Sequence, residues 1–165
     1  MSLAESIQWL QATPLSTTIR ESDWVFPSIE SVHVIAFVLV LGSIFIVDLR
    51  LVGFASRNRR IDELTERLLP LTWAAFAIAA AAGLLLFVGK PVTYTSNAYF
   101  LGKLVLLALA GLNMAAFHLF VHREVVGLAP GAPEPVGAKV SGLLSLLLWI
   151  GVVACGRMIG FTALG

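Results

Sequence analysis

Three histidines and a small set of charged side chains interrupt the long apolar runs of this 165-residue chain. Glu30 and His33 lie three residues apart in the segment SIESVHVIAF, at positions 28–37. This spacing puts both side chains on one face of a helix. An imidazole and a carboxylate can ligate a metal, exchange a proton, or hydrogen-bond the headgroup of a membrane-soluble cofactor. Ionisable groups inside an apolar segment usually face the protein interior, so this pair is the first candidate for a site.

The composition indicates a membrane protein. Hydrophobic residues make up 58% of the chain and charged residues 13%, with a mean hydropathy of +0.91. A soluble domain has roughly 45–50% apolar and about 25% charged residues. The net charge of +1 gives no basic field for nucleic acid, and a single cysteine, Cys155, excludes an intrachain disulfide. The expected partner is therefore the lipid bilayer, and nucleic acid is not expected.

Four segments are long enough to cross a bilayer as helices, which takes about 20 apolar residues. They cover about 29–52, 68–88, 100–121 and 140–162. Each is continuously apolar, and an open sheet edge cannot face lipid, so strands are excluded. The sequence predicts an all-α, integral-membrane four-helix bundle in residues 28–165. Residues 1–27 are expected to form a periplasmic interfacial segment, in which the helical spacing of its apolar residues favours one short helix on the membrane surface.

The Lys and Arg residues near the ends of the spans predict the orientation. The first and third connections, with their flanking ends, carry Arg50, Arg57, Arg59, Arg60, Arg67, Arg123 and Lys139. The opposite side carries Arg20, Lys90, Lys103 and Arg157. We therefore expect these two connections to be cytoplasmic. The chain would then be a multi-pass protein of the bacterial inner membrane with both termini in the periplasm.

Polar side chains are expected at two levels of the predicted bundle. Spans one and four are antiparallel, so the start of one lies level with the end of the other. The predicted outer pocket consists of His33, Glu30, Arg157, Met158 and Lys103. The predicted inner cluster consists of Asp48, Asn113, His118, His122 and Trp73. We further expect Glu30 and His33 to face Arg157, and Asp48 to meet His118 across the bundle.

The outer level is compatible with a redox cofactor. A haem b held by His33 and His118 is excluded, because at 1.5 Å per residue the two lie roughly 20 Å apart along the membrane normal. His33 with Met158 passes this depth test, and Arg157 and Lys103 would then meet the haem propionates. A quinone headgroup would suit the same histidine and basic groups. No cofactor is singled out by the sequence.

Other interpretations remain open at both levels. Glu30 and Arg157 could form a purely structural ion pair, and the histidines could simply hydrogen-bond neighbouring helices. His118 and His122 have the i,i+4 spacing of two metal ligands, with Asp48 as a third, but two histidines are too weak a signal to predict a metal site.

Several of these polar residues lie in longer runs that resemble a family. The runs are VFPSIESVHVIAFVLVLGSIFIVDLRLVG, LLPLTWAAFAIAAAAGLLLF, NAYFLGKLVLLALAGLNMAAFH and CGRMIGF. Over residues 24–162 the chain resembles a family of uncharacterised four-span proteins of bacterial inner membranes. The resemblance implies the architecture and no activity. A likeness to four-helix b-type cytochromes is architectural only.

The sequence thus predicts an accessory or electron-transfer module that binds haem b or a quinone headgroup at its periplasmic side. It predicts no independent catalytic activity, since no nucleophile–base set, Gly-rich phosphate loop or CxxC motif occurs in the sequence. The alternatives are a structural or partner-binding membrane subunit and a small-ion or solute carrier. A homo-oligomer and a larger membrane complex are both open.

Overall fold

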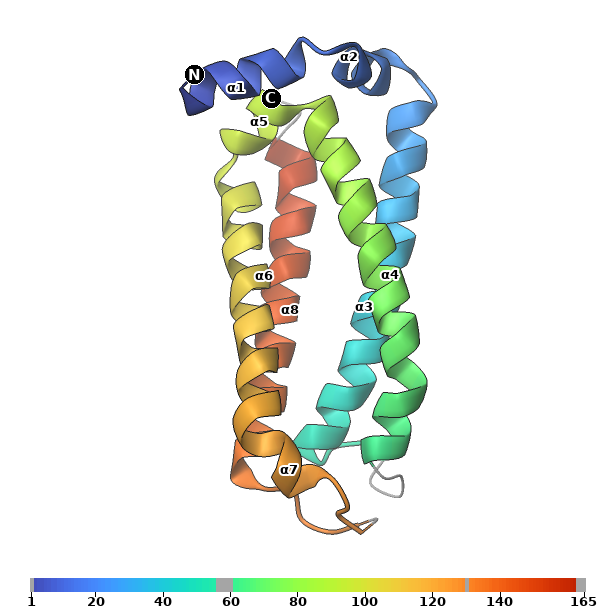
Figure 1. The fold of residues 1–165 in the computed structure, drawn as a ribbon, viewed down its shortest axis with the longest axis vertical. Coiled ribbons are helices and arrows are strands. Elements are labelled where there is room, and N and C mark those ends of the chain that lie inside the picture. Colours follow the sequence, from blue (N-terminus) through green and yellow to red (C-terminus); the bar gives the residue numbers. More distant parts are fainter. Residues whose placement is uncertain (1, 56–60, 130, 163–165) are drawn as a thin grey trace.

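The computed structural model describes residues 2–55, 61–129 and 131–162, and within them it contains helices and no strand (Figure 1). Arg57, Arg59 and Arg60, which contribute to the predicted orientation, lie outside the described residues. The elements in chain order are α1 (Leu3–Gln11), α2 (Pro14–Glu21), α3 (Val25–Val52), α4 (Ile61–Gly89), α5 (Pro91–Thr95), α6 (Ala98–Ala116), the π-helical turn η1 (Phe117–Val121), α7 (His122–Val125) and α8 (Val136–Thr162).

Four helices are long and apolar enough to cross a membrane. They are α3, α4, α8 and the continuous helix Ala98–Val125 formed by α6, η1 and α7. The prediction of an all-α membrane bundle is therefore confirmed. Local sequence sets several of the helix ends. Gly53, with φ of 82°, ends α3 in the left-handed conformation that glycine adopts at low cost. The Asn97 side chain caps α6 by accepting from two backbone N–H groups, and it also donates to the Thr162 hydroxyl at 2.8 Å.

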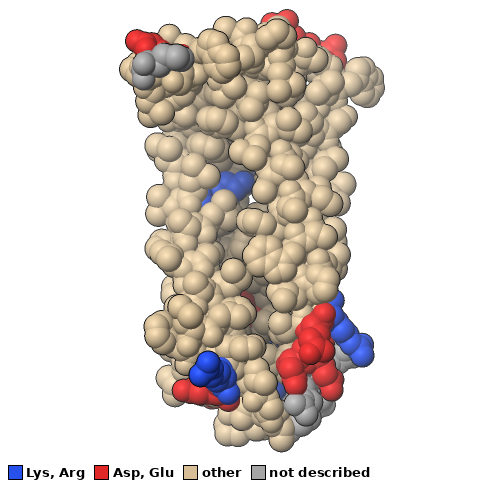
Figure 2. Space-filling view, viewed as in Figure 1, with Lys and Arg blue, Asp and Glu red and all other residues tan. Residues whose placement is uncertain are grey.

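The long helices pack in the order α4, α3, α8, α6, each against the next. In the part of the chain that is described, α4 and α6 do not pack closely together, so the bundle is open along that side (Figure 1). The core between the helices includes Val40, Ala75, Ala110, Trp149 and Val152. Many large apolar side chains outside this core are exposed, as expected where lipid replaces water. On the face shown in Figure 2, the charged side chains gather mainly at the two ends.

Two short helices, α1 and α2, lie across the end of the bundle where α3 begins and α8 ends (Figure 1). We call this the outer end. The short helix predicted in residues 1–27 is thus present, and a second one follows it. Helix α2 is fixed to α4: the Ser16 hydroxyl donates to the Gly89 carbonyl at 3.3 Å, and Ile19 is buried against the same glycine. Trp9 and Trp24 remain exposed, as interfacial anchors do.

Candidate functional site

A recess on the open side of the bundle contains two of the predicted site residues. Its side chains come from α3 and α6, and glycines of α4 and α8 complete it. We define the outer recess by His33, Phe37, Gly83, Lys103 and Gly156. Figure 2 shows a broad face with few charged side chains between its two ends, and one patch of basic atoms set back between the helices in its upper half.

The half-buried His33 is oriented by helix α4. Its Nδ1 lies 2.8 Å from the carbonyl oxygen of Ala79. A carbonyl only accepts hydrogen bonds, so Nδ1 carries a hydrogen and donates it, and Nε2 stays available for another group. The imidazole can approach α4 closely because Gly83 has no side chain: a Cβ there would be 3.1 Å from His33 Cε1 and 3.3 Å from Nδ1.

Lys103 reaches into the same recess from α6. Its Nζ lies 5.3 Å from the centre of the Phe37 ring, in a cation–π contact, and 3.8 Å from where a Cβ on Gly156 would be. The Phe37 ring is nearly parallel to the His33 ring, with 6.2 Å between their centres, and lies 5.9 Å from Trp149. The structure therefore brings His33 and Lys103 together, and the two interact electrostatically.

The ammonium of Lys103 interacts electrostatically with the Cys155 thiol of α8 but forms no ion pair among the described residues. Among the described residues no carboxylate lies within ion-pair distance of it, although the side chain is half-buried within a membrane-spanning helix. Charged groups at such positions are normally paired with each other or with backbone carbonyls. The recess therefore contains one strong hydrogen-bond donor, the Lys103 ammonium, and one imidazole nitrogen, Nε2 of His33. Neither takes part in a described ion pair.

Glu30 and Tyr94 lie near the outer end of the recess. Glu30 is exposed and interacts electrostatically with both His33 and Tyr94. Tyr94, on α5, packs against Phe100 with 5.2 Å between ring centres. Burial raises the pKa of the Tyr94 phenol above its ordinary value of 10.0, and the Glu30 carboxylate raises it further. Tyr94 is not among the site residues predicted from the sequence. Its only sequence signal is an aromatic residue with a polar tip between two spans.

No described contact joins Arg157 or Met158 to the residues of the outer recess. Arg157 is exposed, and its guanidinium lies 4.5 Å from the centre of the Phe161 ring, one turn further along α8. Within the described residues no ion pair joins Arg157 to Glu30, so the expected contact between them is absent. The physical reason is local: Arg157 and Phe161 share a face of α8, and stacking there keeps the guanidinium at the surface. Met158 is also exposed.

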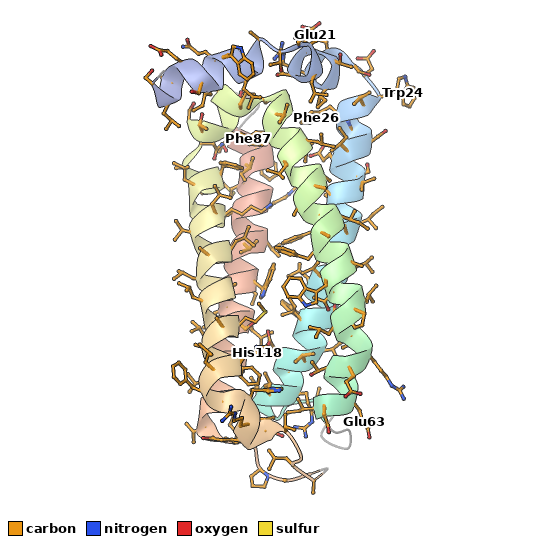
Figure 3. The ribbon with its side chains drawn as sticks, in the orientation of Figure 1. Glu21, Trp24, Phe26, Glu63, Phe87 and His118 are labelled. Atoms are coloured by element: carbon orange, nitrogen blue, oxygen red, sulfur yellow. The ribbon has the colours of Figure 1, made fainter. Side chains whose placement is uncertain are left out.

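The predicted inner cluster divides into separate groups. Asp48 is buried, and the Ser145 side chain hydrogen-bonds it. His118 is exposed near the end opposite α1 and α2 (Figure 3), and its Nδ1 donates to the Met114 carbonyl at 2.9 Å. No hydrogen bond between Asp48 and His118 occurs in the described part of the chain, so their expected contact is also absent. His118 instead stacks on His122 with 5.3 Å between ring centres.

The two remaining members of the predicted inner cluster have other neighbours. Asn113 and Ser141 join α6 to α8: the Asn113 amide donates to the Ser141 carbonyl at 3.0 Å, and the Ser141 hydroxyl donates to the Asn113 side-chain oxygen at 3.2 Å. Trp73 is exposed and meets the Phe76 ring edge-on. These residues therefore fasten helices or face outward, and they do not form one site with Asp48.

A buried ion pair that was not predicted from the sequence lies at the inner end of the bundle, opposite α1 and α2. Arg50, near the end of α3, donates to the carboxylate of Glu134, and each side chain is only 2% exposed. Glu134 belongs to the Pro-rich connection before α8, where it is the single acidic residue of PGAPEPVG. An isolated carboxylate in an otherwise uncharged loop was the available signal.

Comparison with known proteins gives a family and no activity. Residues 18–162 match a family described as a family of unknown function, DUF6644. No curated protein and no solved structure matches the chain. The resemblance to an uncharacterised family is confirmed, and the chain belongs to the DUF6644 family.

Proposed function

We propose that the outer recess binds the headgroup of a membrane-soluble quinone, and that the protein is a small electron-transfer or accessory module of the bacterial inner membrane. The observation that carries the proposal is the half-buried Lys103 ammonium without a described counter-charge, beside His33 with its free Nε2. A polar ligand would compensate both groups. The distribution of Lys and Arg supports a periplasmic outer end.

The chemistry of a quinone headgroup suits these side chains. A quinone carbonyl oxygen accepts a hydrogen bond from the Lys103 ammonium, whereas a quinol hydroxyl donates one to Nε2 of His33. Phe37 and Trp149 supply aromatic surface of the kind that lines small-molecule sites. The open side between α4 and α6 faces lipid, so an isoprenoid tail can remain in the bilayer while the headgroup enters.

Haem b fits the described contacts less well. Haem ligation needs a second axial ligand or an open face opposite His33. Met158, the second ligand suggested by depth, is exposed. Its one described hydrogen bond is that of its backbone carbonyl with Thr162, and no described contact joins it to His33. At this level the interior is occupied by Phe37, Trp149 and Val152, which pack on one another. A quinone ring needs far less of this space than a macrocycle does.

Tryptophan fluorescence can test quinone binding, because quinones quench nearby indoles and Trp149 lies 5.9 Å from Phe37. The protein would be placed in lipid nanodiscs and titrated with a benzoquinone and a naphthoquinone that carry short isoprenoid tails. Replacing the other tryptophans by phenylalanine leaves Trp149 as the single reporter; these are Trp9, Trp24 and Trp73. We expect saturable quenching by at least one of the two quinones.

Matched variants separate site binding from partition into lipid. His33→Gln and Lys103→Met should each raise Kd about tenfold, equal to about 1.4 kcal/mol. The controls are His122→Gln and Lys90→Met. Lys90 also lies over an aromatic ring, that of Phe26 at 4.6 Å, but outside the recess.

Three results would contradict the proposal. Quenching that never saturates would indicate partition into lipid alone, and unchanged affinity in both recess variants would place the quinone elsewhere. A Soret band with reducible α and β bands in the visible spectrum of the purified protein would indicate haem instead. A colourless protein without saturable binding would favour the structural or partner-binding subunit.

A further inference from the structure

A second unusual polar group lies in the inner half of helix α3. Asp48 is 6% exposed, inside a span of high hydropathy. One hydrogen bond is described for its carboxyl group, from the Ser145 side chain. The other oxygen, Oδ2, is buried and has no hydrogen-bond partner. An ionised carboxylate can accept about four hydrogen bonds, so this environment supplies too few donors to stabilise its charge.

No positive charge compensates Asp48 from the helices around it. Within the described chain it forms no ion pair, and Ser145 of α8 is its one described polar neighbour. Helix α8 approaches closely because Gly142 has no side chain; a Cβ there would lie 3.0 Å from the Asp48 carbonyl oxygen. Arg50, two residues along α3, pairs with Glu134. His118 donates to its own helix.

An ionised carboxylate without a cation costs far more free energy in an apolar interior than the neutral acid does. We infer that Asp48 is a proton-binding site within the membrane: the neutral acid is the resting form, and it exchanges its proton with water. The bound species is a proton, which neutralises the charge without needing further oxygen ligands. An alkali cation would need several such ligands around Oδ2.

Glu134 provides an internal comparison. It is also buried and also has one oxygen, Oε2, without a hydrogen-bond partner. Its other oxygen, however, accepts from the Arg50 guanidinium. Burial is therefore similar at the two sites, and they differ in the presence of a counter-charge.

Infrared spectroscopy of the protein in lipid films can test this inference without any reagent having to reach Asp48. A protonated carboxyl group has a carbonyl-stretch band separate from the bands of ionised carboxylates and amides. We expect such a band in the wild-type protein at neutral pH, sensitive to deuteration, absent in Asp48→Asn and retained in Glu134→Gln. The band should disappear reversibly as the pH is raised over the range in which the protein stays folded.

Folding is checked separately. Asn is a neutral group of nearly the same shape as the protonated acid, so Asp48→Asn should keep the thermal unfolding temperature of the wild type. Asp48→Glu should restore a protonated-carboxyl band. The inference is overturned if the wild-type protein has no such band, or if the band persists in Asp48→Asn. It is also overturned if sodium abolishes the band at constant pH, because the ligand would then be a metal cation. The test does not depend on quinone binding.

Discussion

Replacing Glu134 by alanine should lower the free energy of unfolding by about 3–5 kcal/mol, because it removes one member of a buried ion pair. The structure supports a value in this range, since both side chains are 2% exposed and solvent therefore screens little of the interaction. Arg50 has a further interaction, which should place the loss toward the lower end. The pair links residues 84 positions apart in the sequence, so its loss should also loosen the connection before α8.

An exposed pair in the same chain provides the matched control. Arg20 and Glu21 lie 3.5 Å apart at the outer end, but their side chains are 30% and 67% exposed. Exposed ion pairs contribute about 0–1 kcal/mol, so Glu21→Ala should be close to neutral. Both variants remove one glutamate side chain beside one arginine, and they differ mainly in burial.

The two losses can be measured by SDS-induced unfolding in mixed micelles, followed by the loss of tertiary fluorescence and of circular dichroism. A double variant, Arg50→Met with Glu134→Leu, adds a further test. Replacing both members of a buried pair by apolar residues of similar volume is often neutral or stabilising. We therefore expect the double variant to be more stable than Glu134→Ala.

Two results would refute this reasoning. One is a loss for Glu134→Ala no larger than that for Glu21→Ala, which would mean that solvent reaches the inner pair. The other is a double variant whose loss equals the sum of the losses measured for Arg50→Met alone and Glu134→Leu alone, since side chains in contact are expected to be coupled.

Three further predictions follow from single contacts. Gly83→Ala should weaken quinone binding, because its Cβ would lie 3.1 Å from His33 Cε1 and move the imidazole; an unchanged Kd in the fluorescence titration would contradict this. In an ultraviolet absorbance titration Tyr94 should ionise above pH 10.0, and Glu30→Gln should lower that pKa. Because the pKa of Tyr94 is higher in the folded state than in the unfolded state, its contribution to folding stability is fully present below pH 10.0 and is lost as the pH rises beyond it. In a cysteine-free background, an impermeant thiol reagent applied to whole cells should label a cysteine at position 95 and spare one at Asn58, which lies outside the described residues. The reverse pattern would invert the predicted orientation.

The spans and the depth of each polar group could be predicted from the sequence because both follow from counting along a helix. An apolar run of sufficient length must be helical in lipid, and each residue advances 1.5 Å. His33 and Lys103 were assigned to one level on this basis, and they do lie at one recess. Arg157 was assigned to the same level but lies over Phe161 at the surface. Depth does not determine which neighbour a helix face meets.

The residues that were missed lie where periodicity gives no information. Tyr94 belongs to a five-residue helix between spans, and Glu134 to a Pro-rich connection. Their contacts depend on how the chain returns to the bundle. Asp48 shows the opposite case, because its level was predicted and its expected partner was not found. Helix α8 supplies Ser145 there, at a close approach that a glycine permits.

The contrast between Lys103 and Arg50 gives the strongest argument that the outer recess holds a ligand. Both are cations at membrane-spanning helices, and burying such charges is costly. At the inner end the chain compensates the charge itself, because a connecting loop brings Glu134 onto Arg50. At the outer recess the described chain offers Lys103 the Phe37 ring, the Cys155 thiol and the space beside Gly156, but no carboxylate within ion-pair distance. The protein thus supplies a carboxylate for its buried cation at the inner end but none for Lys103 at the outer recess. Because the recess lies on the open side of the bundle, this difference favours a hydrogen-bond acceptor that enters from the membrane.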